Sequence, residues 1–214
     1  MENRTGVIFD MDGTLWDSSQ EVADSWTQVL QRRPETARVL TKEEIQAVMG
    51  MTMTRIAQTL FSDLPEETQM MLLAECTDYE NEDLSLHGAR LYPGLKETLL
   101  TLSDQYPLFI VSNCQSGYIE AFLSYYRFGT YFRDFLCFGD NGLPKADNIR
   151  ELARRSDLDV YYYVGDIQGD YDATMKAGGR FIHAAYGFGT INAPVPAIRS
   201  LSELPGLLKT LPVT

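Results

Sequence analysis

Residues 6–14 read GVIFDMDGT, an apolar run followed directly by two carboxylates and a glycine. The run Gly6–Phe9 is continuously apolar and does not alternate with polar residues, which is typical of a strand buried on both faces of a parallel sheet. Asp10 and Asp12 follow this strand, and Gly13 permits a sharp backbone turn behind them. The stretch therefore predicts a buried strand that ends in a pair of acids.

Four further apolar runs of the same kind occur later in the chain. They are Leu108–Val111, Phe135–Phe138, Tyr161–Val164 and Phe181–Ala184. Roughly 20 to 25 residues with helix-like spacing separate one of these runs from the next, the layout of repeated strand and crossover-helix units. We therefore predict an α/β fold with a doubly wound, Rossmann-like parallel-sheet core, closed by a tail helix over Leu201–Leu211.

The interval between the first two runs is about a hundred residues, which is too long for one crossover helix. Four segments within it have apolar residues near helical spacing, with proline or glycine between them. These segments are Ser18–Arg33, Thr41–Val48, Thr52–Phe61 and Pro65–Tyr79. We predict that residues 17–88 form an inserted all-helical domain, and that residues 1–16 and 89–214 form the α/β core.

The composition is that of an ordinary globular protein with an acidic balance. The formal net charge of −12 argues against a nucleic-acid or anionic-membrane partner, because both require a basic face. Three cysteines without metal-ligand spacing, and the lack of a signal-peptide pattern, indicate the reducing cytoplasm. A monomer is the default expectation for a chain whose insert must open and close.

Acidic residues follow two of the predicted strands. Asp10 and Asp12 come after the first, and Asp166 and Asp170 come after the run that ends at Val164. In a doubly wound sheet the ligand lies beyond the carboxyl ends of the strands, so these four carboxylates should converge. Neighbouring like charges resist joint ionisation unless a cation is bound. An all-oxygen set favours Mg²⁺ over zinc.

The spacing of Asp10 and Asp12 suits a reaction in which one carboxylate is the nucleophile and the other transfers a proton. In an extended segment, side chains two residues apart leave the backbone on the same side. One carboxylate can therefore attack phosphorus while the other transfers a proton at the bridging oxygen, the aspartyl-phosphate route. A hydroxyl such as Ser112 and a lysine such as Lys145 would neutralise the phosphoryl oxygens.

Four motifs together resemble the signature of the haloacid dehalogenase-like superfamily. In chain order they are Asp10-Met11-Asp12-Gly13-Thr14, Ser112-Asn113, Lys145, and Gly165-Asp166 with Asp170. The helical insert after the first motif resembles the cap of the phosphoglycolate phosphatase and β-phosphoglucomutase group. The aspartate at position 12 resembles the phosphatase and phosphomutase branches more than the dehalogenases.

The resemblance implies a role for each motif residue. Asp10 would be the nucleophile and Asp12 the general acid and base. Ser112, Asn113 and Lys145 would bind the phosphoryl group. Mg²⁺ would be bound by Asp10, Asp166, the backbone carbonyl of Asp12, and Asp170, the last either directly or through water. The implied enzyme is a Mg²⁺-dependent phosphatase acting on a small phosphomonoester, phosphoglycolate-like or a sugar phosphate.

Two alternatives to this function stay open. A β-phosphoglucomutase-like enzyme would carry a histidine shortly after the Asp-Ser pair, and the stretch Asp17–Val22 has none, which favours water as the final acceptor. A non-catalytic, phosphate-binding regulatory protein would have lost motif residues, and none is lost. Arg55, in the insert, could read a substrate carboxylate or second phosphate, or be a surface arginine on a helix.

Overall fold

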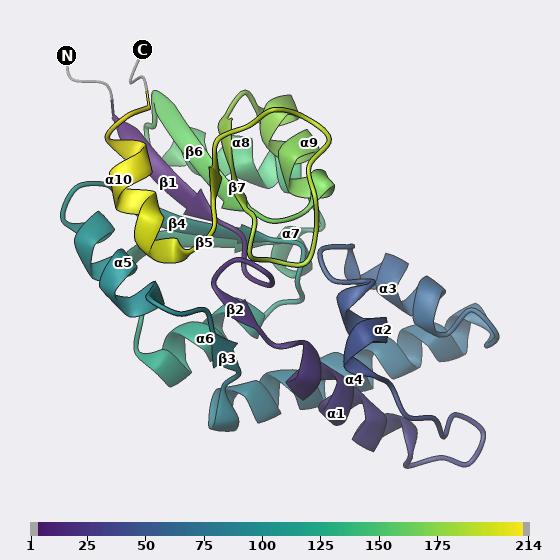
Figure 1. Ribbon diagram of the computed structural model, residues 1–214. Helices are drawn as coiled ribbons and strands as arrows, with labels where there is room; N and C mark the ends of the chain where they lie inside the picture. Colours follow the sequence, from purple (N-terminus) through teal and green to yellow (C-terminus); the bar gives the residue numbers. More distant parts are fainter. Residues whose placement is uncertain (1–3, 212–214) are drawn as a thin grey trace.

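The computed structural model describes residues 4–211, so residues 1–3 and 212–214 of the predicted core lie outside the described part. Within the described residues the main sheet has six strands in the order β5-β4-β1-β6-β7-β8, and every neighbouring pair is parallel (Figure 1). The strands are β1 (Thr5–Phe9), β4 (Leu108–Ser112), β5 (Phe132–Cys137), β6 (Val160–Gly165), β7 (Arg180–Ala184) and β8 (Ala197–Ile198). The predicted doubly wound parallel sheet is confirmed.

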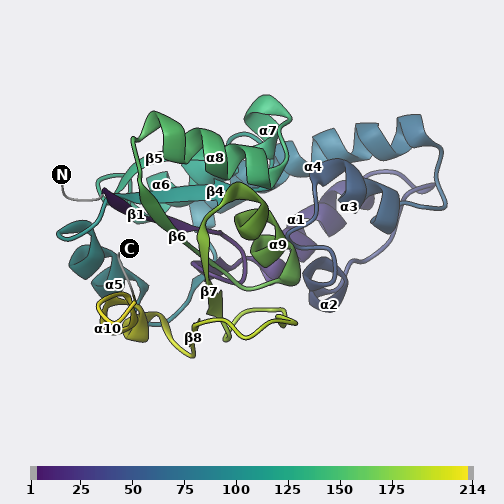
Figure 2. The same ribbon diagram turned by 90° about the horizontal axis from the view of Figure 1, so that it is seen from above.

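Helices cover both faces of this sheet because alternate residues of its buried strands point in opposite directions. Val7 and Phe9 of β1 belong to one buried cluster, and Ile8 belongs to another. The first cluster includes residues of α5 (Leu95–Ser103), α6 (Tyr118–Tyr126) and α10 (Leu204–Leu208), and the second includes residues of α8 (Lys145–Arg155) and α9 (Gln168–Ala177). In Figure 2, α8 and α9 lie in front of the sheet and α6 behind it.

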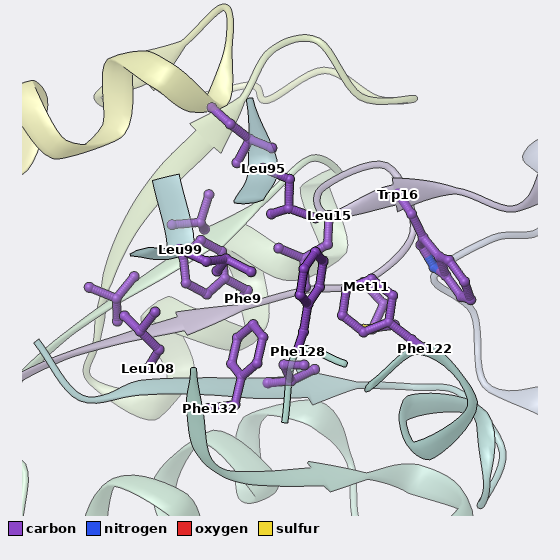
Figure 3. Packing of buried hydrophobic residues seen from close by; sticks show 14 of the residues in the cluster. Phe9, Met11, Leu15, Trp16, Leu95, Leu99, Leu108, Phe122, Phe128 and Phe132 are labelled. Atoms are coloured by element: carbon purple, nitrogen blue, oxygen red, sulfur yellow. The ribbon is translucent and has the colours of Figure 1, made fainter. Parts of the chain in front are cut away.

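The first cluster is rich in aromatic side chains. Figure 3 shows Phe9, Phe122, Phe128 and Phe132 close to one another, with Trp16 at one end of the group. Trp16 is fully buried and contacts the Phe122 ring edge-on, at a centroid distance of 5.1 Å. Because Trp16 is four residues after Asp12, this packing fixes the chain just beyond the predicted catalytic pair.

The helical insert consists of α1 (Ser19–Leu30), α2 (Lys42–Gln46), α3 (Met53–Leu60) and α4 (Glu66–His87), and it projects from the carboxyl end of the sheet (Figure 1). Trp26, Leu30, Phe61 and Leu72 form part of its own buried cluster. All four helices fall within residues 17–88. The division of the chain into two domains at these boundaries stays a prediction.

The two connections between core and insert lie side by side. Strand β2 (Trp16–Asp17) pairs antiparallel with β3 (Arg90–Leu91). The Asp17 carboxylate accepts hydrogen bonds from Lys42 Nζ at 2.8 Å and from an Arg90 guanidinium nitrogen at 2.7 Å. Burial would raise the pKa of Asp17, but hydrogen bonds from Lys42 and Ser19 outweigh it and lower the pKa. Asp17 therefore stays ionised and connects the insert to both linkers.

Helix α4 is longer than the sequence pattern predicted. It runs for 22 residues, whereas the predicted helix ended at Tyr79. Leu84, in the added part, is buried in the same cluster as Trp16 and Phe122 of the core. The last turns of α4 are therefore stabilised by packing against the core, which local spacing does not reveal.

The predicted strand over Phe135–Phe138 is wrong at its end. Cys137 is the last residue of β5 and pairs with Ser112, the last residue of β4. Phe138 has no further strand beside it and begins the short helix α7 (Phe138–Asn141).

The predicted tail helix over Leu201–Leu211 is also wrong in its extent. The segment forms a 3₁₀ turn, η1 (Leu201–Glu203), and then α10. Pro205 has no N–H and is tolerated in the first turn of a helix but not in its interior, so α10 starts anew at Leu204. In the described part of the chain, no helix is both long and apolar enough to cross a membrane.

Candidate active site

The carboxyl end of the sheet brings four of the predicted site residues into contact range. Asp10 follows β1, Asp166 follows β6, Asp170 lies in the first turn of α9, and Lys145 is the first residue of α8. One carboxylate oxygen from each of the three aspartates lies within 4.8 Å of the other two. Lys145 Nζ donates to Asp10 Oδ1 at 2.9 Å and to Asp170 Oδ1 at 2.6 Å.

Two glycines allow the backbone to approach Asp166 closely. Gly13 has φ +78°, and a Cβ there would lie 2.1 Å from Asp166 Oδ2. A Cβ at Gly187 would lie 2.3 Å from the Asp166 Cβ. The N–H of Phe188 donates to Asp166 Oδ2 at 2.7 Å, so the carboxylate is oriented by the loop that follows β7.

The buried acids repel one another in the absence of a cation. Burial, followed by the charge of Asp170, raises the pKa of Asp10 to about 7. The same two causes raise the pKa of Asp166 to about 8. Burial opposes the charge of Lys145, but Asp10 and Asp170 more than compensate and raise its pKa. A single lysine does not neutralise three carboxylates, so this oxygen-only donor set fits a hard divalent cation such as Mg²⁺.

Asp12 is held apart from this cluster. Its Oδ1 accepts hydrogen bonds from Ser18 Oγ and from the Tyr118 hydroxyl, each at 2.7 Å. Burial raises the pKa of Asp12 to about 6, while the hydrogen bonds from Tyr118 and Ser18 act in the opposite direction. A carboxyl group that titrates near neutral pH can both donate and accept a proton.

Replacing Tyr118 with phenylalanine should slow turnover by about tenfold, because Asp12 loses one of the two donors that orient it. The measurement is kcat on a phosphomonoester, together with a circular dichroism spectrum to show that the fold is unchanged. Tyr125→Phe is the matched control, since Tyr125 lies on the same helix but is 41% exposed. Equal kcat values for wild type and Tyr118→Phe would show that Tyr118 does not position Asp12.

The predicted phosphate-binding pair lies at the end of β4. Ser112 is buried as the last residue of that strand. Asn113 follows it, and its side-chain Nδ2 donates to the carbonyl oxygen of Gly50 in the insert at 2.8 Å. Its Oδ1 is buried and has no hydrogen-bond partner among the described residues.

A cavity lies between the core and the insert, next to Ser112 and Asn113. Its empty space, including its open mouth, is about 460 Å³. Asp12, Ser112 and Asn113 line it from the core, and residues of α1, α2, α3 and α4 line it from the insert. Arg55 is exposed on α3 and is not among the lining residues.

Glu80 of α4 is a buried acid in the wall of this cavity. It accepts a hydrogen bond from the Trp26 indole N–H at 2.6 Å. Burial raises its pKa to about 8, against an ordinary value of 4.5. Between these two values the unfolded chain has released the proton that the folded chain retains, so stability falls as the pH rises from about 4.5 to about 8.

Replacing Glu80 with glutamine should remove this pH dependence, because glutamine keeps an acceptor for Trp26 and has no proton to lose. We expect the variant to match wild type near pH 5 and to exceed it at pH 8 by up to about 5 kcal/mol. Urea unfolding at pH 5, 6, 7 and 8 measures this. Glu82→Gln is the control, because Glu82 is exposed on the same helix. If the stability of Glu80→Gln fell with pH as steeply as that of wild type, the raised pKa of Glu80 would be contradicted.

Sequence reasoning missed several residues that contact the predicted catalytic groups. Tyr118 is 106 positions from Asp12, and nothing in its local pattern marks it. The Tyr163 hydroxyl lies 3.3 Å from Asp10 Oδ1 and donates to the Val111 carbonyl at 2.6 Å, yet Tyr163 reads as an ordinary strand residue. Ser18, which donates to Asp12, does have a signal in the sequence, because it belongs to the Asp-Ser pair that follows the first motif.

The family model for haloacid dehalogenase-like hydrolases matches residues 7–184, which is most of the chain. The chain belongs to this family. It is therefore an enzyme of the haloacid dehalogenase-like hydrolases, and the matched range includes every motif residue described above. The sequence-based resemblance is confirmed.

Curated relatives and solved structures agree with this assignment. The phosphoglycolate phosphatase of Shigella boydii is 26% identical over 212 residues, covering 87% of this chain and 83% of the relative. The phosphoglycolate phosphatase of Salmonella typhimurium is 25% identical, and the match covers 88% of this chain and 84% of the relative. Two solved structures have the same fold. One, a predicted phosphatase from Clostridium acetobutylicum, has a TM-score of 0.80 and 21% identity, and the match covers 99% of this chain and 100% of that one. The other, a haloacid dehalogenase-like hydrolase from Streptococcus pneumoniae, has a TM-score of 0.82 and 19% identity, and the match covers 97% of this chain and 100% of that one.

Proposed function

We propose that this phosphatase hydrolyses a small phosphomonoester, phosphoglycolate-like or a sugar phosphate, through a covalent aspartyl-phosphate on Asp10. The observation that carries the proposal is the contact of Asp10 with Lys145 inside a buried cluster of acids, with Asp12 held separately beside it. This arrangement supplies a nucleophile, a positive charge and a separate proton-transfer group at one end of the sheet.

The first step would be attack by an Asp10 oxygen on phosphorus. The bond from phosphorus to the ester oxygen breaks, and Asp12 gives its proton to that oxygen so that the alcohol leaves uncharged. In the second step water attacks phosphorus, Asp12 takes the proton from this water, and the bond from phosphorus to Asp10 breaks. Inorganic phosphate is released, and both aspartates return to their starting states.

Lys145 and the residues after β4 would bind the phosphoryl oxygens. Lys145 contributes a buried positive charge and Ser112 a hydroxyl. Asn113 contributes its backbone N–H or the second N–H of its side-chain amide, since one of the two already donates to Gly50. Donors fixed before the reaction stabilise developing negative charge without reorganising. Closure of the insert would exclude bulk water from the site.

Mg²⁺ is the metal that this donor set fits best. Asp10, Asp166 and Asp170 would hold it with their side chains, directly or through water, and Asp12 with its backbone carbonyl. When bound there, Mg²⁺ would supply positive charge to the phosphoryl group and favour the ionised form of the acids.

The experiment that tests the proposal is phosphate release from a panel of phosphomonoesters. The panel should include phosphoglycolate, hexose phosphates and nucleotides, each assayed with Mg²⁺ and with EDTA. We expect release with Mg²⁺, complete loss in EDTA, and recovery on adding excess Mg²⁺. Full activity in EDTA would overturn the metal assignment, and no release from any ester would overturn the phosphatase assignment.

A further inference from the structure

The cavity between core and insert is where the alcohol part of a substrate would lie. Asp12 and Ser112 line it, so a phosphoryl group bound at Asp10, with its ester oxygen toward the proton-transfer group Asp12, would place its alcohol part in this space. The chemistry of the lining residues therefore bears on which alcohols the enzyme accepts.

The insert supplies an apolar wall to this cavity. Val22 comes from α1, Ile45 from α2, and Met53 and Ile56 from α3. The three aliphatic side chains are at most 8% exposed. Such a wall favours a leaving group with an apolar side, because each buried methylene contributes about 0.8 kcal/mol.

The polar side chains that line the cavity are acidic or uncharged: Asp12, Trp26, Glu80, Ser112, Asn113, Gln115 and Tyr118. Glu80 supplies no positive charge in either protonation state, and Trp26 already donates to it. The Asn113 N–H₂ donates to Gly50, while the buried Asn113 Oδ1 lacks a partner among the described residues. A hydroxyl on the leaving group could donate to such acceptors, whereas a carboxylate could not.

Positive charge is absent from this wall. Among the described residues that line the cavity, none is lysine, arginine or histidine. Lys145 is engaged by Asp10 and Asp170 and is not a lining residue, and Arg55 is exposed outside the cavity. A carboxylate moved here would lose its hydration without gaining a cation, next to the carboxyl groups of Asp12 and Glu80.

We propose that the cavity selects phosphomonoesters of uncharged, partly apolar alcohols that carry a hydroxyl, and rejects esters whose alcohol carries a carboxylate. The inference rests on the proposed phosphatase function. Of the two substrate kinds in the proposed function it excludes the phosphoglycolate-like one, which is also the kind named in the curated relatives. It favours 2-hydroxyethyl phosphate over phosphoglycolate, two esters that differ in the terminal group alone.

The test compares kcat/KM for these two esters, with Mg²⁺, in wild type and two variants. We expect wild type to prefer 2-hydroxyethyl phosphate by about tenfold or more. Met51→Lys places a cation at the mouth of the cavity and should reduce this preference by about threefold or more. Met71→Lys is the matched control, since Met51 is 36% and Met71 40% exposed, and Met71 on α4 does not line the cavity.

The possible outcomes separate this inference from the proposed function. Equal kcat/KM for the two esters, or a preference for phosphoglycolate, would overturn the inference alone. If that preference disappeared in Arg55→Ala, Arg55 would be the carboxylate-binding residue. If Met51→Lys and Met71→Lys changed the preference between the two esters equally, the inference would also be overturned, because net charge and not the cavity would then be responsible. No release from either ester would overturn both the function and the inference.

Discussion

Asp10→Asn should abolish phosphate release, reducing kcat by about 10⁴-fold or more, because an amide oxygen is a poor nucleophile toward phosphorus. The fold should remain, since Lys145 keeps its 2.6 Å hydrogen bond to Asp170. Removing one of three buried acids also relieves repulsion, so the thermal midpoint at pH 8 without Mg²⁺ should be no lower than that of wild type.

Two measurements check this expectation. Phosphate release at high enzyme concentration gives the residual rate, and mass spectrometry after an acid quench detects a phosphorylated Asp10 peptide in wild type but not in the variant. Asp172→Asn is a suitable control, because Asp172 is an exposed acid of α9 outside the cluster. Substantial residual activity in Asp10→Asn would remove Asp10 as the nucleophile.

Lys145→Gln should have the second largest effect, on both activity and stability. Lys145 is 5% exposed and is the hydrogen-bonded cation of two buried carboxylates, Asp10 and Asp170. Its removal leaves those charges without a partner, which typically costs about 3 to 5 kcal/mol. We also expect kcat to fall by about 10³-fold, because a fixed positive charge on the phosphoryl group is lost.

Urea unfolding without Mg²⁺ and phosphate release with Mg²⁺ measure the two effects separately. Lys176→Gln, at an exposed lysine of α9, has the same charge change and should behave as wild type in both. Added Mg²⁺ should restore part of the lost stability of Lys145→Gln, because the cation neutralises the same acids. An unchanged stability of Lys145→Gln without metal would contradict the ion pairs described here.

The α/β fold and the position of the acids could be predicted because the decisive signals are local. Continuous apolar runs mark strands buried on two faces, and the residue after such a strand necessarily lies at the carboxyl edge of a parallel sheet. Asp10 and Asp166 are in this situation, and the structure places their oxygens within 4.8 Å of each other. The catalytic and metal-binding roles assigned to them stay predictions until the variants are measured.

What the sequence by itself determined is therefore the core, its family and the residues at its carboxyl edge. The tertiary structure alone decided that Tyr118 of the core reaches Asp12. It also decided how the insert sits on that edge: Leu84 packs into the core, and Arg55 lies outside the cavity that Glu80 lines. The reason is physical. Strand ends are positioned by hydrogen bonding within one sheet. The face that a helix turns toward a distant element depends instead on side-chain packing between segments as many as 106 residues apart, which no local pattern records.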